Sequence, residues 1–318
     1  MIRYLAKRVL QGVFVLWAAY TLSFLILYLL PGDAASIAAS GGGDADTVDP
    51  ALVARLRHEY GLDRPLWQQY LVALGRALTG DFGVSAQTGR PALRSVAEVL
   101  PNTLVLAAVA LILAVLAGFL LAIACTFPRA AWLRQALSAL PPLGAAVPVF
   151  WVGLLLLQAF SFGLHWFPAL GDAGPSSLVL PAVTLAVPTS AYIAQLLSRS
   201  LRLTLARPFI GQVRAKGASE SRVHVAHALR NAVLPALTMV GVLVGNLLAG
   251  TVVTETVFSR TGIGRLVVKA VGDRDIPVVQ VVVVLAAVVF VLSSLVIDVL
   301  HPLIDRRITL GRPALAAA

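Results

Sequence analysis

The chain has 318 residues, of which 58% are hydrophobic and only 13% are charged, and its formal net charge is +10. So few charged residues cannot cover the surface of a water-soluble globule, because typical soluble domains carry about 25%. The composition therefore excludes an ordinary soluble protein and indicates a chain that lies mostly in lipid. The positive charge gives no reason to expect a nucleic-acid partner, because the basic residues occur in short clusters between long apolar runs.

Six apolar stretches are each long enough to cross a bilayer as a helix, which needs about 20 residues. Helices are expected because lipid offers no partners for backbone N–H and C=O groups. The sequence therefore predicts an all-α membrane protein with six transmembrane helices, at about Val9–Leu30, Thr103–Phe127, Leu137–Phe160, Leu178–Leu197, Ala236–Phe258 and Val278–Leu300. The first run is too long for the apolar segment of a signal peptide, so we expect it to stay as an anchor.

These stretches divide the chain into parts. We expect residues 1–30 to form an N-terminal anchor span, 31–101 an extracytoplasmic insertion, 102–305 a core of five spans and 306–318 a cytoplasmic tail. The core includes a basic loop at 199–235. Within the insertion, Leu66–Leu78 has the pattern of an amphipathic helix. Two roles fit this helix, a docking surface for a partner and a cover for the edge of the bilayer.

The distribution of Lys and Arg predicts the orientation, because these residues are retained on the cytoplasmic side. With the N-terminus inside, 15 of the 25 basic residues fall in cytoplasmic segments. Among the acidic residues, only Glu220 and Asp305 lie clearly on that side. We therefore expect both termini to be cytoplasmic.

The chain lacks the residues that several classes of protein need. Its three lysines, Lys7, Lys216 and Lys269, follow Ala or Val, so the Gly-Lys-[Ser/Thr] phosphate loop of an ATPase is absent. The first four predicted spans contain no charged residue, which disfavours a carrier driven by protonation. His224 and His227 have no third ligand near them in sequence, so a solvated helix explains them better than a metal site. No catalytic, cofactor or metal site is expected.

The basic loop predicts two short helices that meet at a glycine. Gly217 suits the left-handed residue that ends a helix, and Ser219 suits the cap of the next one. Val223, Ala226 or His227, and Arg230 then recur at helical spacing. The alternative is an ordinary basic loop that merely follows the charge rule.

The stretch Val213–Pro235, VRAKGASESRVHVAHALRNAVLP, resembles the extended cytoplasmic loop of the permease subunits of dipeptide, oligopeptide and nickel ABC importers. The resemblance extends over nearly the whole chain and is to the B-type member. It includes Arg3–Leu10, Leu30–Asp33, Tyr60–Leu66, Gly80–Ser85, Leu100–Thr103, Glu255–Phe258, Gly262–Arg265, Arg274–Pro277 and Asp298–Asp305. Two departures are Ser259-Arg-Thr-Gly262, where the family usually has Ser-Trp-Pro-Gly, and Asp305-Arg-Arg307, where it usually has Asp-Pro-Arg.

This resemblance implies a type I ABC importer permease fold and a non-catalytic subunit. The subunit would form half of the translocation pathway for di- or oligopeptides or related solutes, including nickel chelates, and needs no cofactor. The implied partners are a homologous second permease subunit, one or two cytoplasmic ATPase subunits and an extracytoplasmic substrate-binding protein. The implied location is the plasma membrane of a bacterium or archaeon. A self-contained secondary carrier or channel is the first alternative, and a membrane scaffold is the second.

The resemblance also implies which residues carry the function. The two short helices that meet at Gly217, which we call the elbow, would form the coupling helix that seats in a groove on the ATPase. The residues that this implies are Arg214, Ala215, Lys216, Gly217, Ala218, Ser219, Glu220 and Arg222. The pathway and its outer gate would include Glu255, Asn246 and Gln195. Two interpretations of Glu255 stay open: it forms the outer gate or meets a peptide amine, or it pairs with Arg260 or Arg265.

Overall fold

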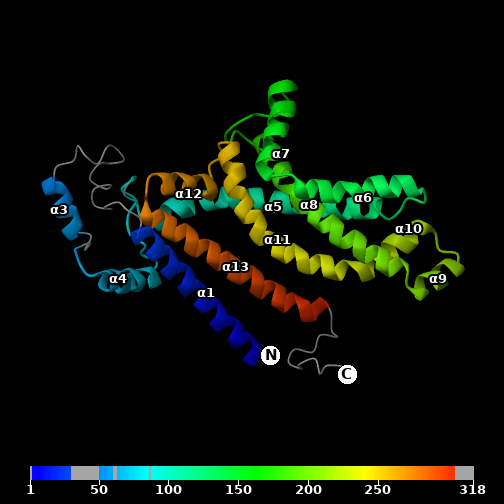
Figure 1. Ribbon diagram of the computed structural model, residues 1–318, viewed down its shortest axis with the longest axis horizontal. Coiled ribbons are helices and arrows are strands. Elements are labelled where there is room, and N and C mark those ends of the chain that lie inside the picture. Colours follow the sequence, from blue (N-terminus) through cyan, green and yellow to red (C-terminus); the bar gives the residue numbers. More distant parts are fainter. Residues whose placement is uncertain (1, 30–49, 60–62, 86, 305–318) are drawn as a thin grey trace. The chain divides into compact units, whose positions relative to one another are not determined.

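The computed structural model describes residues 2–29, 50–59, 63–85 and 87–304 (Figure 1). Within these ranges the chain is almost entirely helical, and its only β feature is an isolated bridge between Val84 and Pro91. The predicted all-α class is therefore confirmed. The tail 306–318 and the motif residues 30–33, 60–62 and 305–307 lie outside the described residues.

The described chain divides into two compact units. The first contains Thr103–Arg260 and the residues from Leu292, and the second contains Ile2–Asn102 and Thr261–Val291. The helices, in chain order, are α1 (Ile2–Leu29), α3 (Pro50–Glu59), α4 (Leu66–Leu78), α5 (Ala92–Ala124), α6 (Ala131–Ala146), α7 (Val149–Leu156), the π-helix η2 (Leu157–Gly163), α8 (Ser176–Leu205), α9 (Pro208–Ala215), α10 (Glu220–Arg222), the π-helix η3 (Val223–Ala228), α11 (Leu229–Val257), α12 (Ile263–Gly272) and α13 (Ile276–Ile304).

Four of the described helices are long and apolar enough to cross a membrane as single spans, and they lie in α1, α5, α8 and α13. A fifth crossing is available if α6 and the helix Val149–Gly163 count as one bent span. In α11, the apolar stretch found among the described residues is shorter, Val242–Val257. The structure thus supports a multi-span membrane protein with four or five such crossings by length and composition.

The predicted span Leu137–Phe160 is not one straight helix. Its two halves are bent by 104° at the break between Ala146 and Val149. Pro148 causes the break, because a proline disfavours helical backbone at the residue before it, and Val147 is indeed extended, with φ −79° and ψ 127°. Pro181 and Pro188, in contrast, lie inside the continuous helix α8.

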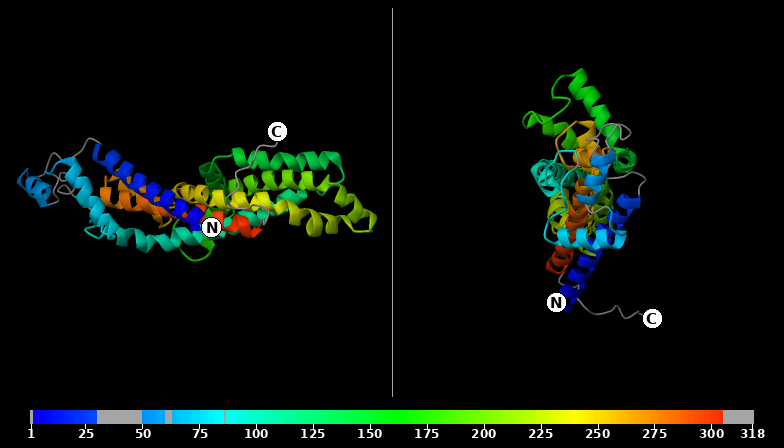
Figure 2. Two further views of the ribbon diagram at one scale, coloured as in Figure 1. Left: turned by 90° about the horizontal axis from the view of Figure 1, so that it is seen from below. Right: turned by 90° about the vertical axis from the view of Figure 1, so that its left-hand side faces the viewer.

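In the first unit, α8 packs against α6, α7 and α11, and it lies beside α11 in every view (Figure 1, Figure 2). Small residues also lie between α8, α11 and α5: Ala110 of α5 and Ala182 of α8 are buried with Leu185 and Leu247. A Cβ on Gly118 of α5 would come within 2.8 Å of Ile193 and 2.9 Å of the Ser190 carbonyl oxygen. Small residues of this kind let membrane helices approach closely, so that dispersion contacts can hold them together.

In the second unit, two motifs far apart in sequence meet. Ser85 donates a hydrogen bond to the buried carboxylate of Asp275, and Gly83 lies against the Pro277 ring. An apolar cluster of Ala92, Val96, Ala270, Val278, Val279 and Val281 supports this contact. The predicted amphipathic helix Leu66–Leu78 is confirmed as α4, whose Tyr70 contacts Phe24 and shares a hydrogen bond with Thr21 of α1.

Candidate functional site

The predicted elbow is present between α9 and α10. Gly217 has φ +79°, in the left-handed region that glycine tolerates best. Its N–H donates to the Arg214 carbonyl at 2.9 Å, and the next N–H, of Ala218, reaches the Val213 carbonyl at 3.4 Å. These bonds satisfy carbonyls that the end of a helix would otherwise leave open. Local sequence therefore fixes where α9 stops and how sharply the chain turns.

The second arm of the elbow begins with a side-chain cap. The Ser219 hydroxyl accepts a hydrogen bond from the Arg222 N–H at 3.4 Å, as expected for serine at a helix start. From Glu220 the chain continues without a break through α10, the π-helix η3 and α11. The elbow is thus attached directly to the apolar helix α11.

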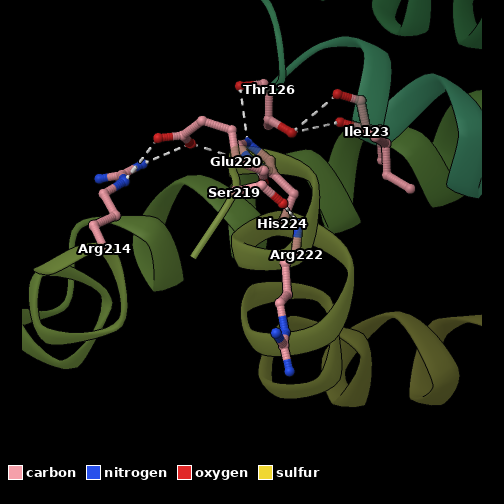
Figure 3. A network of polar contacts seen from close by, with 8 residues as sticks. Ile123, Thr126, Arg214, Ser219, Glu220, Arg222 and His224 are labelled. Atoms are coloured by element: carbon pink, nitrogen blue, oxygen red, sulfur yellow. Dashed lines mark hydrogen bonds and ion pairs between the residues drawn. The ribbon is translucent and has the colours of Figure 1, made fainter. Parts of the chain in front are cut away.

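An ion pair connects the two arms (Figure 3). Arg214 Nε lies 3.0 Å from Glu220 Oε1, and Arg214 Nη2 lies 3.1 Å from Oε2. This two-point geometry fixes the relative orientation of the side chains. The hydrogen bond from Arg214 lowers the pKa of Glu220 below its ordinary value of 4.5. The carboxylate therefore stays ionised at neutral pH, and the pair braces the turn.

Behind the turn lies a buried histidine. The ring of His224 is 4% exposed, with Nδ1 3.0 Å from the Glu220 carbonyl oxygen and Nε2 3.4 Å from the Thr126 carbonyl oxygen. Its ring also lies 5.1 Å from that of Phe127, between centroids. Thr126 follows α5, so His224 joins the elbow to a helix that is remote in sequence (Figure 3).

An apolar cluster anchors the base of the elbow. Ile210 of α9 and Val223 of η3 are fully buried against Leu201 of α8 and Ala122 of α5. Burying an aliphatic side chain of this size contributes about 1.5–3 kcal/mol. Ala218, at the turn itself, is partly buried against the same cluster. The turn is therefore held on its inner side by packing.

The outer side of the elbow faces solvent. Ala215, Lys216, Gly217 and Arg222 are exposed, and so is the apolar side chain of Val225, at 54%. Exposed basic groups beside a small apolar patch, on a braced turn, suit a contact with another protein. A rigid knob of this kind can transmit a displacement to the helices that carry it.

The three candidate pathway residues differ in their surroundings. Glu255 of α11 is 1% exposed and accepts a hydrogen bond of 2.6 Å from Thr103 of α5. Gln195 of α8 is partly buried and donates to the Pro141 carbonyl at 3.2 Å, whereas Asn246 is exposed. Glu255 and Asn246 are nine residues apart on α11, which places them on opposite faces at 3.6 residues per turn. The three side chains are therefore not gathered into one site within this unit.

Arg260 has a different partner from the one that sequence suggested. Its Nη2 lies 3.0 Å from Asp172 Oδ1, and its Nη1 donates to the carbonyl and the hydroxyl of Ser177, each at 3.1 Å. Among the described residues these are the closest partners of the Arg260 side chain, and the pairing of Glu255 with Arg265 stays a prediction. The buried guanidinium ties the loop before α8 and the first turn of α8 to the end of α11.

Sequence reasoning missed three long-range contacts, those of Thr103, Arg260 and His224. Thr103 and Glu255 are 152 positions apart, and His224 and Thr126 are 98 apart. In a single sequence no local pattern connects such residues. The only signal was chemical, since a charged group inside an apolar helix requires a polar partner.

Comparison with known proteins places this chain in a family. Residues 114–310 match the model of the binding-protein-dependent transport system inner membrane component, and residues 1–107 match the N-terminal model of such membrane components. The glutathione transport system permease protein GsiC of Salmonella choleraesuis strain SC-B67 is 37% identical over 305 residues, which is 96% of this chain and 98% of the relative.

The protein of the same name from Escherichia coli strain K12 is 35% identical over the same shares of the two chains. Among solved structures, one described as an amino acid ABC transporter with histidines is 20% identical and covers 66% of this chain and 92% of its own, with a TM-score of 0.48. Two family models that together span nearly the whole chain, and relatives matched over almost their full length, give one conclusion. The chain belongs to the family of binding-protein-dependent transport system inner membrane components and is the permease subunit of an ABC importer.

Proposed function

We propose that the elbow of α9, Gly217 and α10 is the surface on which a cytoplasmic ATPase subunit docks. The observation that carries this proposal is the braced and exposed turn. The Arg214–Glu220 pair and the buried base make it rigid, while Lys216 and Arg222 face solvent. A rigid turn passes a movement of the ATPase to α8 and α11, which a flexible loop would absorb.

The complete importer would contain a homologous second permease subunit, one or two ATPase subunits and an extracytoplasmic substrate-binding protein. We propose six spans with both termini cytoplasmic in the inner membrane, with the bent α6–α7 pair and α11 as two of the six. The insertion 31–101 would then face the binding protein. Because its relatives are named as glutathione transport permeases, we propose peptide-like solutes such as glutathione as the substrate class.

Site-specific crosslinking tests the docking surface. Lys216→Cys and Arg222→Cys, each on a Cys125→Ser background, are assembled with the ATPase subunits and treated with a short thiol crosslinker. We expect a permease–ATPase product from both positions, with a yield that changes when ATP is added. Leu170→Cys, exposed in the loop after η2, is the control and should give none. An importer that transports but gives no product from either elbow position would contradict the proposal.

Substrate class needs a separate measurement. Proteoliposomes that contain the whole importer and its binding protein are tested with radiolabelled glutathione and with radiolabelled Ala-Ala. We expect ATP-dependent uptake of at least one of them, and none with an ion gradient in place of ATP. If neither accumulates although a loaded binding protein stimulates ATP hydrolysis, the peptide-like class is wrong while the docking surface is unaffected.

A further inference from the structure

The elbow is connected by the chain to only two of the long helices of its unit. Through α9 it continues backwards into α8, and through α10 and η3 it continues forwards into α11. Helix α5 has no such connection, because it ends about 100 residues earlier in sequence. A displacement of the elbow therefore reaches α5 only through side-chain and backbone contacts.

His224 makes a polar contact between the elbow and the end of α5. Its Nε2 lies 3.4 Å from the Thr126 carbonyl oxygen, in the turn that follows α5, where the N–H of Thr126 donates to the Ile123 carbonyl at 3.0 Å. The last carbonyls of a helix have no partner within it, and a histidine near the helix end can bond to them. The Phe127 ring lies against the same imidazole, so both a hydrogen bond and packing hold this end of α5.

The other side of the ring faces the elbow. Nδ1 lies 3.0 Å from the Glu220 carbonyl oxygen and 3.8 Å from the Glu220 carboxylate, which is in turn held by Arg214. Polar contacts thus run without interruption from Arg214 of α9, through Glu220 and His224, to the end of α5 (Figure 3). His224 also lies in the π-helix η3, a wider turn that leaves Val223, His224 and Ala228 all buried. Such turns are frequent at functional positions.

We infer that His224 is a positioning residue that makes α5 move with the elbow during transport. This inference rests on the proposed docking of the ATPase at the elbow. The contacts of the imidazole are with Glu220, Thr126 and Phe127 of the permease itself. It acts by holding the end of α5 against the turn, so that three helices, rather than two, follow the ATPase.

Two substitutions separate the hydrogen bond from the packing. His224→Phe keeps a ring against Phe127 but removes both ring nitrogens, of which a neutral imidazole uses one as a donor. His224→Gln keeps an amide NH2 group that can donate to the Thr126 carbonyl. His227→Phe is the matched control, because His227 lies one turn further on and its ring makes none of these contacts. Each variant is assembled with the ATPase subunits and the binding protein in proteoliposomes, and radiolabelled glutathione taken up per ATP hydrolysed is measured.

We expect His224→Phe to reduce uptake per ATP about fivefold, the size of effect that losing one hydrogen bond produces. The His224→Phe importer should still assemble with the ATPase subunits and hydrolyse ATP. His224→Gln should recover most of the uptake per ATP, and His227→Phe should have the same uptake per ATP as the wild type. A wild-type ratio in an assembled His224→Phe importer would overturn the inference and leave the docking proposal intact. Absence of a crosslink from both Lys216→Cys and Arg222→Cys, in importers that transport and carry His224, would instead overturn the docking proposal.

A distance measurement covers the case in which His224→Phe does not assemble. Spin labels at Leu120 of α5 and Leu203 of α8, both exposed, report the separation of these helices on the Cys125→Ser background. In the wild type we expect the separation to be the same with and without ATP, because both helices follow the elbow. In His224→Gln the separation should likewise not change with ATP, whereas in His224→Ala the separation should change when ATP is added. An unchanged separation in His224→Ala would overturn the inference.

Discussion

Arg214 and Glu220 face each other across the Gly217 turn, and two hydrogen bonds of 3.0 and 3.1 Å join their side chains. Loss of either side chain would remove the side-chain brace between the two arms and leave the turn held by its backbone bonds and its apolar base. We expect Arg214→Gln and Glu220→Gln each to reduce ATP-dependent uptake without loss of membrane insertion. The exchanged pair, Arg214→Glu with Glu220→Arg, should recover part of it. Uptake assays with blots of the membrane fraction check this, and unaltered uptake in both single variants would contradict the brace.

The same pair predicts a pH dependence. The bond from Arg214 lowers the pKa of Glu220 below 4.5, so the unfolded chain takes up a proton at higher pH than the folded chain does. The stabilisation of the folded state by this ion pair is therefore complete above about pH 4.5 and is lost as the pH falls through the lowered pKa of Glu220. The difference in Tm between wild type and Glu220→Gln in detergent should be constant at neutral pH and shrink below that value. A difference that grows on acidification would be inconsistent with the pair.

Gly217 should be sensitive to any side chain, although nothing lies within 4 Å of the position of its missing Cβ. Its φ of +79° costs other residues about 1–2 kcal/mol. Gly217→Ala should therefore reduce uptake modestly. Gly217→Pro, which also removes the bond to the Arg214 carbonyl, should abolish it. Gly211→Ala, inside α9 and with open space around it, is the control and should be close to neutral. Full uptake in an assembled Gly217→Pro importer would contradict the elbow as a coupling device.

The Thr103–Glu255 contact gives a test of the two interpretations of Glu255. Thr103→Val removes a buried donor to a carboxylate that is 1% exposed, at a cost of about 1–3 kcal/mol, so the Tm in detergent should fall. Thr256→Val, whose hydroxyl bonds only within its own helix and is exposed, should have a smaller effect. If Glu255 is part of an outer gate, Glu255→Gln should alter uptake in assembled importer. If the Glu255→Gln importer shows the same uptake as the wild type, the outer-gate interpretation is wrong and Glu255 has a structural role.

Gly118 should tolerate no larger residue. A Cβ there would meet the Ile193 side chain at 2.8 Å and the Ser190 carbonyl oxygen at 2.9 Å, and the backbone oxygen cannot turn away. We expect Gly118→Ala to destabilise the protein by about 1–3 kcal/mol through overpacking. Gly75→Ala in α4, where the space is open, should leave the Tm unchanged or raise it slightly, because alanine favours a helix more than glycine does. Thermal unfolding in detergent distinguishes the two, and equal Tm values would show that α5 and α8 are further apart than this packing requires.

Local chemistry made much of the elbow and the helical class predictable. Gly217 and Ser219 act on hydrogen bonds within five residues, so their spacing alone located the turn and the cap. Apolar runs likewise predicted α1, α5, α8 and α13, because a helix in lipid satisfies its own backbone. The span around Pro148 was the exception. Length and hydropathy favour a continuous helix there, whereas proline disfavours helical backbone at the residue before it, and at Val147 the extended conformation prevailed.

By itself the sequence determined that this chain lies in a membrane, that it resembles an importer permease and where its exposed turn lies. Only the tertiary structure decided which distant groups meet. Helix packing brought Thr103 of α5 to Glu255 of α11 and the end of α5 to His224, and the loops next to α8 and α11 brought Asp172 to Arg260. That packing includes the close approach of helices at small residues such as Gly118. It is a property of many simultaneous packing contacts, and no single segment of sequence contains it.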